Sequence, residues 1–436
     1  MYINQTQLAD RKLHVEASDA MVDRFDVAMI GLGYIGLPTA AIIARAGLSV
    51  RGVDISRRIV DLVNQGEVHI QETDLDALVK NVVTDGMLTA STEAPVADIY
   101  LIAVPTPLAE NNTPDISMVL DAARLVAPVL PAGGCVILES TSPVGTTQQI
   151  SAVLAQLRPD LAIPGHCGDK TPDVHIAYCP ERVLPGRIIE ELVANDRVVG
   201  GITPECARRA QAFYTRFVRG DCIATTAGVA EMVKLTENSF RDVNIAFANE
   251  LSLVAEHMGI DVWEVIRLAN RHPRVNVLQP GPGVGGHCIA VDPWFLVSSA
   301  PEQARVIRTA REVNDAKPDH VVSRLTAMLE GSPGAKIALL GLAFKPNIDD
   351  FRESPALAIA AKVAAQYGDR VLVVEPFTKE LPSPMATSGA RLVKYEEAMA
   401  EADLVGVLVD HDAFRSAPRY LSADKIIYDT RGMWAQ

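Results

Sequence analysis

A glycine-rich turn between a buried strand and a buried helix constrains this chain most. Gly31-Leu-Gly33-Tyr-Ile-Gly36 directly follows the apolar run FDVAMI (25–30), and a helical pattern continues through Ala46. Glycines so placed permit a tight turn and a close approach of the backbone to a pyrophosphate. Asp54 ends the next apolar run, about 20 residues on, where an acid binds the adenosine ribose. The pattern predicts a dinucleotide site, and the acid favours NAD over NADP.

Short apolar runs alternate with helical stretches in two parts of the chain. The first series continues through 48–54, 97–105 and 134–141 and ends at 175–181. The second runs through 336–344, 370–376, 402–410 and 426–432. Such alternation is typical of parallel βαβ sheets. The second series has only Gly341 at its turn, so we expect it to bind something other than a dinucleotide.

A nearly all-helical region separates the two series. Gly228 to Met258 is a helical pattern of about 31 residues, against an average helix of about 11–12. A helix of this length usually spans domains or forms a subunit interface. The expected fold is α/β, with two doubly wound Rossmann-like domains joined by a helical domain with one long central helix. The expected boundaries are an N-terminal extension (1–24), a NAD-binding domain (25–203), a central helical and dimerisation domain (204–325) and a C-terminal α/β domain (326–436).

Charge and cysteine content exclude several classes of protein. The 436-residue chain has a net charge of −14, which disfavours nucleic-acid and anionic-membrane surfaces because both need positive fields. The uncharged stretch 27–44 is long enough to be a transmembrane candidate, but three glycines and Pro38 favour a buried strand and helix. Six cysteines without CxxC or CxxxH spacing predict neither a disulfide framework nor a metal site, and favour a reducing cytoplasm.

The loop PGPGVGGHCIAVDP (280–293) is the richest in candidate chemistry. Its glycines expose backbone amides, and Cys288 stands just past them, four residues before Asp292. A cysteine in this setting is a candidate nucleophile, although a buried cysteine after a flexible loop is the plainer interpretation. His287 is adjacent, but neighbours in sequence rarely point the same way, so we do not expect a Cys–His pair.

Other polar residues lie where a doubly wound fold gathers active groups. Lys234 and Asn238 are spaced i, i+4 on the long helix and therefore project from one face, which could equally be a solvated face. Glu181 follows HIAYCP, and Thr141 follows VILES, at the sheet edge where ligands gather. Either residue could instead be a helix cap.

Seven blocks together resemble the UDP-sugar 6-dehydrogenases, the family of UDP-glucose dehydrogenase, over nearly the whole chain from residue 25. They are GLGYIGLP (31–38), VPTP (104–107), ESTSPVGT (139–146), CPER (179–182), KLTENSF (234–240), GPGVGGHCIAVDP (281–293) and GLAFKPNIDDFRESP (341–355). Within the family, 270–288 and 139–147 look most like the UDP-N-acetyl-D-mannosamine dehydrogenases, which serve bacterial surface polysaccharide synthesis. Ser142 and Val144 fall where family members vary, and residues 1–24 have no counterpart.

The resemblance implies an enzyme that oxidises the primary alcohol of a UDP-sugar twice, consuming two NAD. Cys288 would trap the aldehyde as a thiohemiacetal, and Glu181 would activate the water that hydrolyses the thioester. A depressed pKa of Cys288 is expected, with Lys234 as its cationic neighbour. The implied catalytic residues are Cys288, Lys234, Asn238, Asp292, Glu181 and Thr141.

The resemblance also implies binding residues, with the UDP between the central helices and the C-terminal domain. Lys345 of the AFK motif would contact the substrate, and Arg274 would reach the substrate of a neighbouring subunit. The implied NAD contacts are Gly31, Gly33, Tyr34, Ile35, Gly36, Asp54, Thr106, Thr141 and Arg352. The implied substrate contacts are Glu181, Arg182, Lys234, Asn238, Arg274, Gly285 and Lys345, and no metal is expected.

Several alternatives stay open. A β-hydroxyacid or 6-phosphogluconate-type dehydrogenase would fit Lys234 and Asn238 but not Cys288 or the C-terminal unit. A non-catalytic NAD-binding regulatory protein would not need the intact polar set. Among sugars, UDP-N-acetyl-D-mannosamine is expected, with UDP-GlcNAc and UDP-glucose as alternatives. We expect a cytoplasmic homodimer formed across the long helix, without nucleic-acid or membrane partners.

Overall fold

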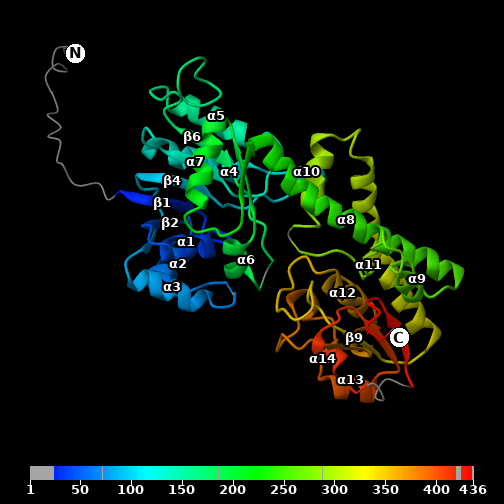
Figure 1. Cartoon of the computed structure of the whole chain (residues 1–436). Coiled ribbons are helices and arrows are strands. Elements are labelled where there is room, and N and C mark those ends of the chain that lie inside the picture. Colours follow the sequence, from blue (N-terminus) through cyan, green and yellow to red (C-terminus); the bar gives the residue numbers. More distant parts are fainter. Residues whose placement is uncertain (1–23, 71, 185, 287, 419–423, 435–436) are drawn as a thin grey trace, which may run out of the picture.

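Two mainly parallel sheets are connected through one long helix (Figure 1). The structure, a computed structural model, describes residues 24–70, 72–184, 186–286, 288–418 and 424–434. The expected N-terminal extension, apart from Arg24, and His287 lie outside the described residues. Within the described residues, no helix is both long and apolar enough to cross a membrane.

The first unit contains an eight-stranded sheet in the order β3-β2-β1-β4-β5-β6-β7-β8. Only the pairing of β6 with β7 is antiparallel among the described strand pairs of this sheet. The order reverses between β1 and β4, and such a switch point opens a crevice at the carboxyl ends of the strands. The strands are β1 (Phe25–Ile30), β2 (Val50–Val53), β3 (Leu88–Ser91), β4 (Ala97–Ile102), β5 (Cys135–Leu138), β6 (His175–Tyr178), β7 (Arg197–Gly201) and β8 (Cys222–Thr226).

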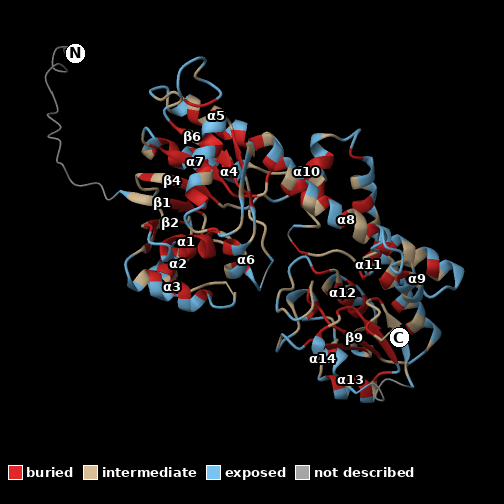
Figure 2. Ribbon diagram, viewed as in Figure 1, coloured by how far each residue is buried: buried red, intermediate tan, exposed pale blue. Residues whose placement is uncertain are grey.

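Helices cover this sheet on both faces, and one apolar cluster lies on each side of it. The central strands are buried on both faces, so most of their positions are apolar. Figure 2 shows the buried positions concentrated in the sheets and on the helix faces that pack against them. The helices are α1 (Gly36–Arg45), α2 (Arg57–Asn64), α3 (Leu75–Thr84), α4 (Ser117–Val126), α5 (Thr146–Leu157), α6 (Ile188–Ala194) and α7 (Pro204–Tyr214).

The sheet continues past the point where the sequence pattern ends it. The predicted strand series stops at 181, and the region after 203 is predicted as nearly all helix, yet β7 and β8 extend the sheet to Thr226. These predictions are wrong for a physical reason. β7 begins with the buried Arg197 and ends in two glycines, and β8 is largely exposed, so neither has an apolar run.

The predicted long helix is confirmed as α8 (Ala227–Met258). Its first turn is capped by the Thr226 hydroxyl, which accepts the Val229 N–H (3.4 Å), and it ends at Gly259, whose φ is +68°. The helix α11 (Arg305–Gly331) packs along it, and α9 (Val262–Ala269) and α10 (Asp292–Ser299) complete the central region.

The second unit is a five-stranded parallel sheet in the order β11-β10-β9-β12-β13, which confirms the predicted second α/β domain. Its strands are β9 (Ile337–Leu340), β10 (Val371–Val374), β11 (Arg391–Leu392), β12 (Leu404–Val407) and β13 (Ile426–Asp429). Its helices are α12 (Pro355–Tyr367), α13 (Tyr395–Glu401) and α14 (Asp412–Arg415).

Candidate functional site

The glycine-rich turn has the geometry that a pyrophosphate needs. Gly31 has a φ of +94°, and a Cβ on Gly36 would overlap the Gly31 carbonyl oxygen. Nothing described lies within 4 Å of the place of a Gly33 Cβ, so the backbone there is open to a ligand. In the described part of the chain, no side chain caps α1 and no acid lies in its first turn. Its N–H groups are therefore available to an anion.

Asp54 stands where a ribose-binding acid is needed. It follows β2, and its carboxylate accepts the N–H groups of Leu32 (3.0 Å) and Ser56 (2.9 Å). These bonds hold the carboxylate beside the glycine-rich turn. The residues present therefore fit NAD, with Gly31, Gly33 and Gly36 at the phosphates and Asp54 at the ribose.

Two loops and the second unit border the same turn. The Thr106 hydroxyl donates to the Thr141 carbonyl (2.6 Å) and links the loops after β4 and β5. Tyr34 and Ile35 are half-buried within the turn. The Arg352 guanidinium, from the second unit, lies over the Tyr34 ring (5.8 Å to its centre) and also pairs with Asp350 (2.6 Å). Arg352 therefore approaches the dinucleotide turn from across the molecule.

Polar side chains converge between α8 and the loop that carries Cys288. The Lys234 amine donates to the Glu181 carbonyl (2.8 Å) and carboxylate (3.1 Å). The Asn238 amide donates to the Asp292 carboxylate, and the Asp292 N–H donates to the Cys288 carbonyl (2.8 Å). Lys234 is 5% exposed and Asp292 is 3% exposed, so these charges interact in a largely dry environment.

Burial and neighbouring charges shift the pKa values of this cluster. Burial raises the pKa of Asp292 from 3.8 to about 7, although Lys234 and Asn238 act against it. Burial alone would lower the pKa of Lys234, but Glu181, Asp292 and Cys288 outweigh it and raise that pKa. The lysine is therefore charged, while Asp292 can exchange a proton near neutral pH.

Cys288 differs from its expected state. Although the residue is exposed at the loop surface, burial of the thiol is the largest cause that raises its pKa to about 12, followed by Asp292 and Glu181. Lys234 lowers this pKa but does not dominate. The predicted depression of the pKa is therefore wrong, because it considers the lysine without the burial of the thiol and without the two carboxylates. The rejected Cys–His pair involves His287, which lies outside the described residues.

The glycines before Cys288 let the loop pass close to the second unit. A Cβ on Gly285 would overlap the Glu353 carbonyl oxygen and crowd Pro355. A Cβ on Gly286 would stand 3.1 Å from the Phe344 ring. The segments 341–347 and 349–355 of the second unit therefore shape the loop, and any larger residue at Gly285 would push it away from them.

A cavity of about 450 Å³ lies beside Lys234. Arg182 lies on it and pairs with Glu237 (2.6 Å), one helical turn from Lys234 on α8. The cavity is therefore polar and carries both signs of charge. Its lining residues are Arg182, Val183, Asn195, Asp196, Lys234, Glu237 and Asn238.

Lys345 faces a second cation across the boundary between the units. Burial and then the positive charge of Arg241 lower the pKa of Lys345, while Glu191 acts against them. Arg241 lies on α8 and Lys345 on the 341–347 loop, so a cation of the central region is near enough to affect a lysine of the second unit. The sequence pattern does not single out Arg241, because its neighbour is more than a hundred residues away.

Within one chain, Arg274 does not lie with the cluster around Lys234 and Cys288. It lies in the exposed turn after α9, and no ion pair of its side chain occurs among the described residues. Thr141 stands beside Thr106 at the dinucleotide crevice and has no described hydrogen bond to the Lys234 cluster. The remaining predicted catalytic residues, Glu181, Lys234, Asn238, Cys288 and Asp292, lie together.

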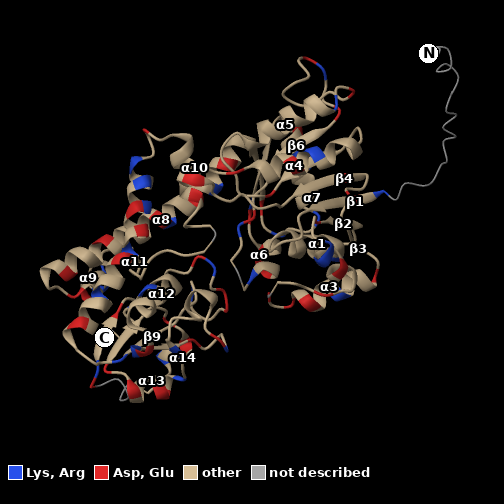
Figure 3. Ribbon diagram, turned by 180° about the vertical axis from the view of Figure 1, so that it is seen from behind, with Lys and Arg blue, Asp and Glu red and all other residues tan. Residues whose placement is uncertain are grey.

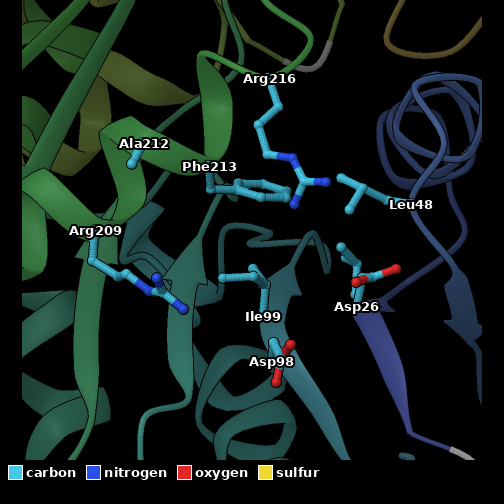
Figure 4. A pocket seen from close by; sticks show the side chains of 9 residues that line it. Asp26, Leu48, Asp98, Ile99, Arg209, Ala212, Phe213 and Arg216 are labelled. Atoms are coloured by element: carbon cyan, nitrogen blue, oxygen red, sulfur yellow. The ribbon is translucent and has the colours of Figure 1, made fainter.

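A smaller hollow of about 120 Å³ lies at the opposite edge of the first sheet (Figure 4). Asp26 and Asp98 lie at the amino ends of β1 and β4, and Arg209 and Arg216 face them from α7 and the turn that follows it. None of the predicted site residues lines this hollow. It is therefore separate from the Lys234 cluster.

Models of one protein family match three consecutive parts of the chain. The NAD-binding domain of the UDP-glucose/GDP-mannose dehydrogenase family matches residues 25–218, its central domain matches 228–316, and its UDP-binding domain matches 338–436. The matched ranges follow the first sheet, the long helix and the second sheet in that order.

Individual relatives resemble the chain over nearly its whole length. An NDP-N-acetyl-D-galactosaminuronic acid dehydrogenase from Ralstonia nicotianae is 55% identical, covering 95% of this chain and 97% of its own. A UDP-N-acetyl-D-mannosamine dehydrogenase from Escherichia coli K12 is 54% identical, covering 94% and 99%. Among solved structures, a UDP-D-ManNAc dehydrogenase from Pyrococcus horikoshii has a TM-score of 0.81 at 38% identity, covering 94% and 96%.

Proposed function

Because this chain belongs to the UDP-glucose/GDP-mannose dehydrogenase family and is an NAD-dependent nucleotide-sugar dehydrogenase, we propose that it oxidises UDP-N-acetyl-D-mannosamine to the uronate. The observation that carries this proposal is the convergence of Lys234, Asn238 and Asp292 on the loop of Cys288. A single oxidation to an aldehyde would need the first three residues and not the thiol.

In the first oxidation, Asp292 takes the proton of the C6 alcohol. Its pKa of about 7 suits it to this exchange at neutral pH. The charged Lys234 stabilises the negative charge that develops on the alcohol oxygen, and Asn238 holds the Asp292 carboxylate in place. NAD, bound at the glycine-rich turn, supplies the acceptor for one hydride in each oxidation.

Cys288 retains the aldehyde for the second oxidation. The thiol sulfur bonds to the aldehyde carbon and its proton passes to the aldehyde oxygen, which gives a thiohemiacetal. Loss of the hydroxyl proton to Asp292 and of a second hydride from the same carbon leaves a thioester. Glu181 then takes one proton from water as the water oxygen bonds to the thioester carbon. The Cys288 sulfur leaves with that proton, returned by Glu181, and the carboxylic acid releases its remaining proton to solvent to give the carboxylate.

The identities to known relatives support an N-acetylated amino sugar. The relatives at 54–55% identity carry names with N-acetylmannosamine or N-acetylgalactosaminuronic acid, whereas a UDP-glucose dehydrogenase from Pyrobaculum islandicum is 26% identical. The equal identity of the two amino-sugar groups makes a UDP-N-acetylgalactosamine substrate the second candidate. UDP-GlcNAc and UDP-glucose follow.

The Lys345–Arg241 pair supports binding of a diphosphate between the units. Burial and then the positive charge of Arg241 disfavour the charged form of Lys345, and an anion bound there would reverse that effect. We assign the substrate diphosphate to this place, with Arg182 and Gly285 toward the sugar. NAD then belongs to the first α/β unit and the uridine to the second.

A homodimer formed across α8 is supported by an apolar stripe that this chain leaves uncovered. Phe240 is 70% exposed, Phe247 57% and Val254 47%, and their seven-residue spacing places them on one helix face. Arg274, exposed beyond α9, is then suited to reach the partner's substrate. The six free thiols are compatible with the cytoplasm as the compartment.

The deciding experiment is the amount of NADH formed per mole of limiting sugar. UDP-N-acetylmannosamine, UDP-N-acetylgalactosamine, UDP-GlcNAc and UDP-glucose are compared in parallel. Two NADH from the first sugar alone would support both reaction and substrate. Two from another sugar would keep the mechanism and change the substrate. One or none from all four would mean that the role of Cys288 is wrong or that the substrate lies outside this set. A Cys288→Ala variant should form no acid.

A further inference from the structure

Asparagines of α8 hold both ends of the Cys288 loop, defined here as residues 281–292. At its start, the Gly281 N–H donates to the Asn249 side-chain oxygen (2.9 Å). At its end, the Asn238 amide donates to the Asp292 carboxylate. Asn238 and Asn249 are 11 residues apart in the sequence, which is close to three helical turns, so both project from one face of α8.

Asn249 ends a buried chain of hydrogen bonds between α8 and α11. Its amide donates to the Asn314 oxygen (2.9 Å), and the Asn314 amide donates to the Asp242 carboxylate (2.8 Å). Arg311 donates to the same carboxylate oxygen (2.6 Å). All four side chains are at most 1% exposed, so no bulk solvent competes for these bonds.

The direction of this chain is fixed at both ends. A backbone N–H can only donate, so the Asn249 oxygen must face Gly281. The Asp242 carboxylate accepts from Arg311, so the Asn314 amide nitrogen must face Asp242. Rotation of either asparagine amide would set donor against donor or acceptor against acceptor. The chain therefore presents one oriented acceptor to the start of the Cys288 loop.

Helix packing alone does not require these groups. Apolar side chains of similar volume can hold two helices together as well as a buried ionic and amide network does. Such side chains could not accept the Gly281 N–H, which would then lose its partner. The distinctive effect of Asn249 is therefore on the loop and not on the contact between α8 and α11.

We propose that Asn249 is a positioning residue for the covalent half of the reaction, because its bond to Gly281 sets where the Cys288 thiol stands. Asn249 touches no reacting atom. Asp292 and Lys234 are held independently, by Asn238 and Glu181. Loss of the Gly281 bond should therefore impair capture of the aldehyde more than the first oxidation. The proposal rests on the proposed role of Cys288.

The test compares Asn249→Ala with Ser252→Ala. Ser252 lies one turn further along α8, half-buried, where its hydroxyl accepts from Lys317 (2.6 Å) and donates to the Asn249 backbone carbonyl (2.6 Å). It has no described bond to the Asn249 side chain or to the Cys288 loop. Ser252→Ala therefore disturbs the helix contact without releasing Gly281. Asn314→Ala, which leaves Asn249 without its orienting partner, is the second variant should Asn249→Ala not fold.

Two readouts separate positioning from stability. The first is the rate of the second oxidation relative to the first, with released aldehyde trapped chemically. The second is the rate at which iodoacetamide alkylates Cys288, followed by peptide mass spectrometry. In Asn249→Ala the relative rate of the second oxidation should fall by about ten- to a hundredfold, since about 1 Å of misplacement has effects of this size. Alkylation should become faster, because the thiol leaves the buried position, and then the two carboxylates, that oppose its ionisation.

Ser252→Ala should keep wild-type values in both readouts, and Asn314→Ala should shift them in the same direction as Asn249→Ala by a smaller amount. Wild-type values in folded Asn249→Ala, or equal shifts in Ser252→Ala, would overturn the proposal. If the wild-type protein forms one NADH per sugar, the proposed function fails, while the alkylation rates still decide whether Asn249 positions Cys288.

Discussion

The buried carboxyl of Asp292 reduces the stability of the fold but is suited to proton transfer. This carboxyl is buried at the end of the Cys288 loop, near Lys234, and burial raises its pKa to about 7. At this value the group is divided between its two protonation states in neutral solution. A base with this property can take a proton from an alcohol and pass it on without a large change of pH.

We predict that kcat/KM rises with pH to a plateau, with a midpoint near pH 7. The ionised form of Asp292 is the one that accepts the alcohol proton, so activity is lost as pH falls below its pKa. Asn238 lowers this pKa through its hydrogen bond, so Asn238→Ala should move the midpoint to higher pH. Initial rates at subsaturating sugar, from about pH 5 to pH 9, measure both profiles. A midpoint near 4, or no displacement in Asn238→Ala, would contradict the assignment.

The same carboxyl should reduce stability at neutral pH. The folded pKa lies above the unfolded one, so between about pH 4 and pH 7 the unfolded chain releases this proton while the folded protein keeps it. Stability is therefore lost as pH rises through this window, by up to about 4 kcal/mol. The Asp292→Asn side chain does not titrate. This variant should be inactive, and at pH 8 its free energy of unfolding should be larger than that of the wild-type protein. Denaturant unfolding of the wild-type protein and of Asp292→Asn at pH 4 and pH 8 checks this. If the free energies of unfolding of the two proteins differ by the same amount at both pH values, the prediction is refuted.

At the scale of helices and strands, the local sequence pattern was sufficient to predict an element wherever the element's own residues are apolar and buried. The strands at 25–30 and 97–102 are apolar apart from Asp26 and Asp98, the strand at 337–340 is wholly apolar, and α8 has an uninterrupted helical pattern. β7 and β8 have no such run, because β7 buries a charged residue and β8 is an edge strand. Their pairing depends on partners that local pattern does not reveal.

The residues of the candidate site likewise fall into those that the local sequence pattern reveals and those that it does not. Residues that lie in short motifs, such as Glu181 and Cys288, are visible in the sequence. Asn249, Arg241 and Glu231 are not, because each acts on an element far away in the chain. From the sequence alone, a polar residue on a long helix is expected to face solvent unless the residue that it contacts is known.

Glu231 illustrates this at the start of α5. From one turn before Lys234, its buried carboxylate accepts the N–H groups of Gly145 (2.7 Å) and Thr147 (2.9 Å) and the Thr147 hydroxyl (2.6 Å). Glutamine has one acceptor oxygen and would set an NH2 group against a donor. We therefore predict that Glu231→Gln lowers the free energy of unfolding by about 1–3 kcal/mol.

The matched control for this prediction is Glu237→Gln on the same helix. Glu237 pairs with Arg182 while about a third of each side chain is exposed, 35% and 32%, and partly exposed pairs contribute about 1 kcal/mol or less. Urea unfolding of the two variants should separate them clearly. Equal losses would mean that the Glu231 carboxylate is not what anchors the loop before α5.

At the scale of the whole molecule, an acidic protein gathers cations at one boundary. The net charge is −14, and Figure 3 shows acidic and basic positions interspersed along both α/β units. Lys345 and Arg352 come from the second unit, and Arg241 and Lys234 from α8. The proposed place for the anionic substrate is where the units meet, so we expect binding to depend on their relative placement.

The apolar stripe on α8 predicts the oligomeric state. Replacing Phe240 and Phe247 by lysine should convert a dimer to monomers, because two charges would have to be buried without partners. Light scattering after gel filtration measures the mass. Met118→Lys, at a residue 46% exposed on α4, is the matched control and should remain dimeric. Retention of the wild-type mass in the double variant would place the subunit contact elsewhere.

If Arg274 acts on the partner's substrate, two inactive chains should restore each other. In a mixed dimer of Cys288→Ala and Arg274→Ala chains, one site combines an intact Cys288 with an intact Arg274 from across the interface. Random pairing makes half of the dimers mixed, each with one complete site, so about a quarter of wild-type activity should return at low sugar concentration. Cys288→Ala mixed with Lys234→Ala restores no complete site, since both residues belong to one chain's cluster. Activity in neither mixture, with mixed dimers verified by mass, would mean that Arg274 does not reach across the interface.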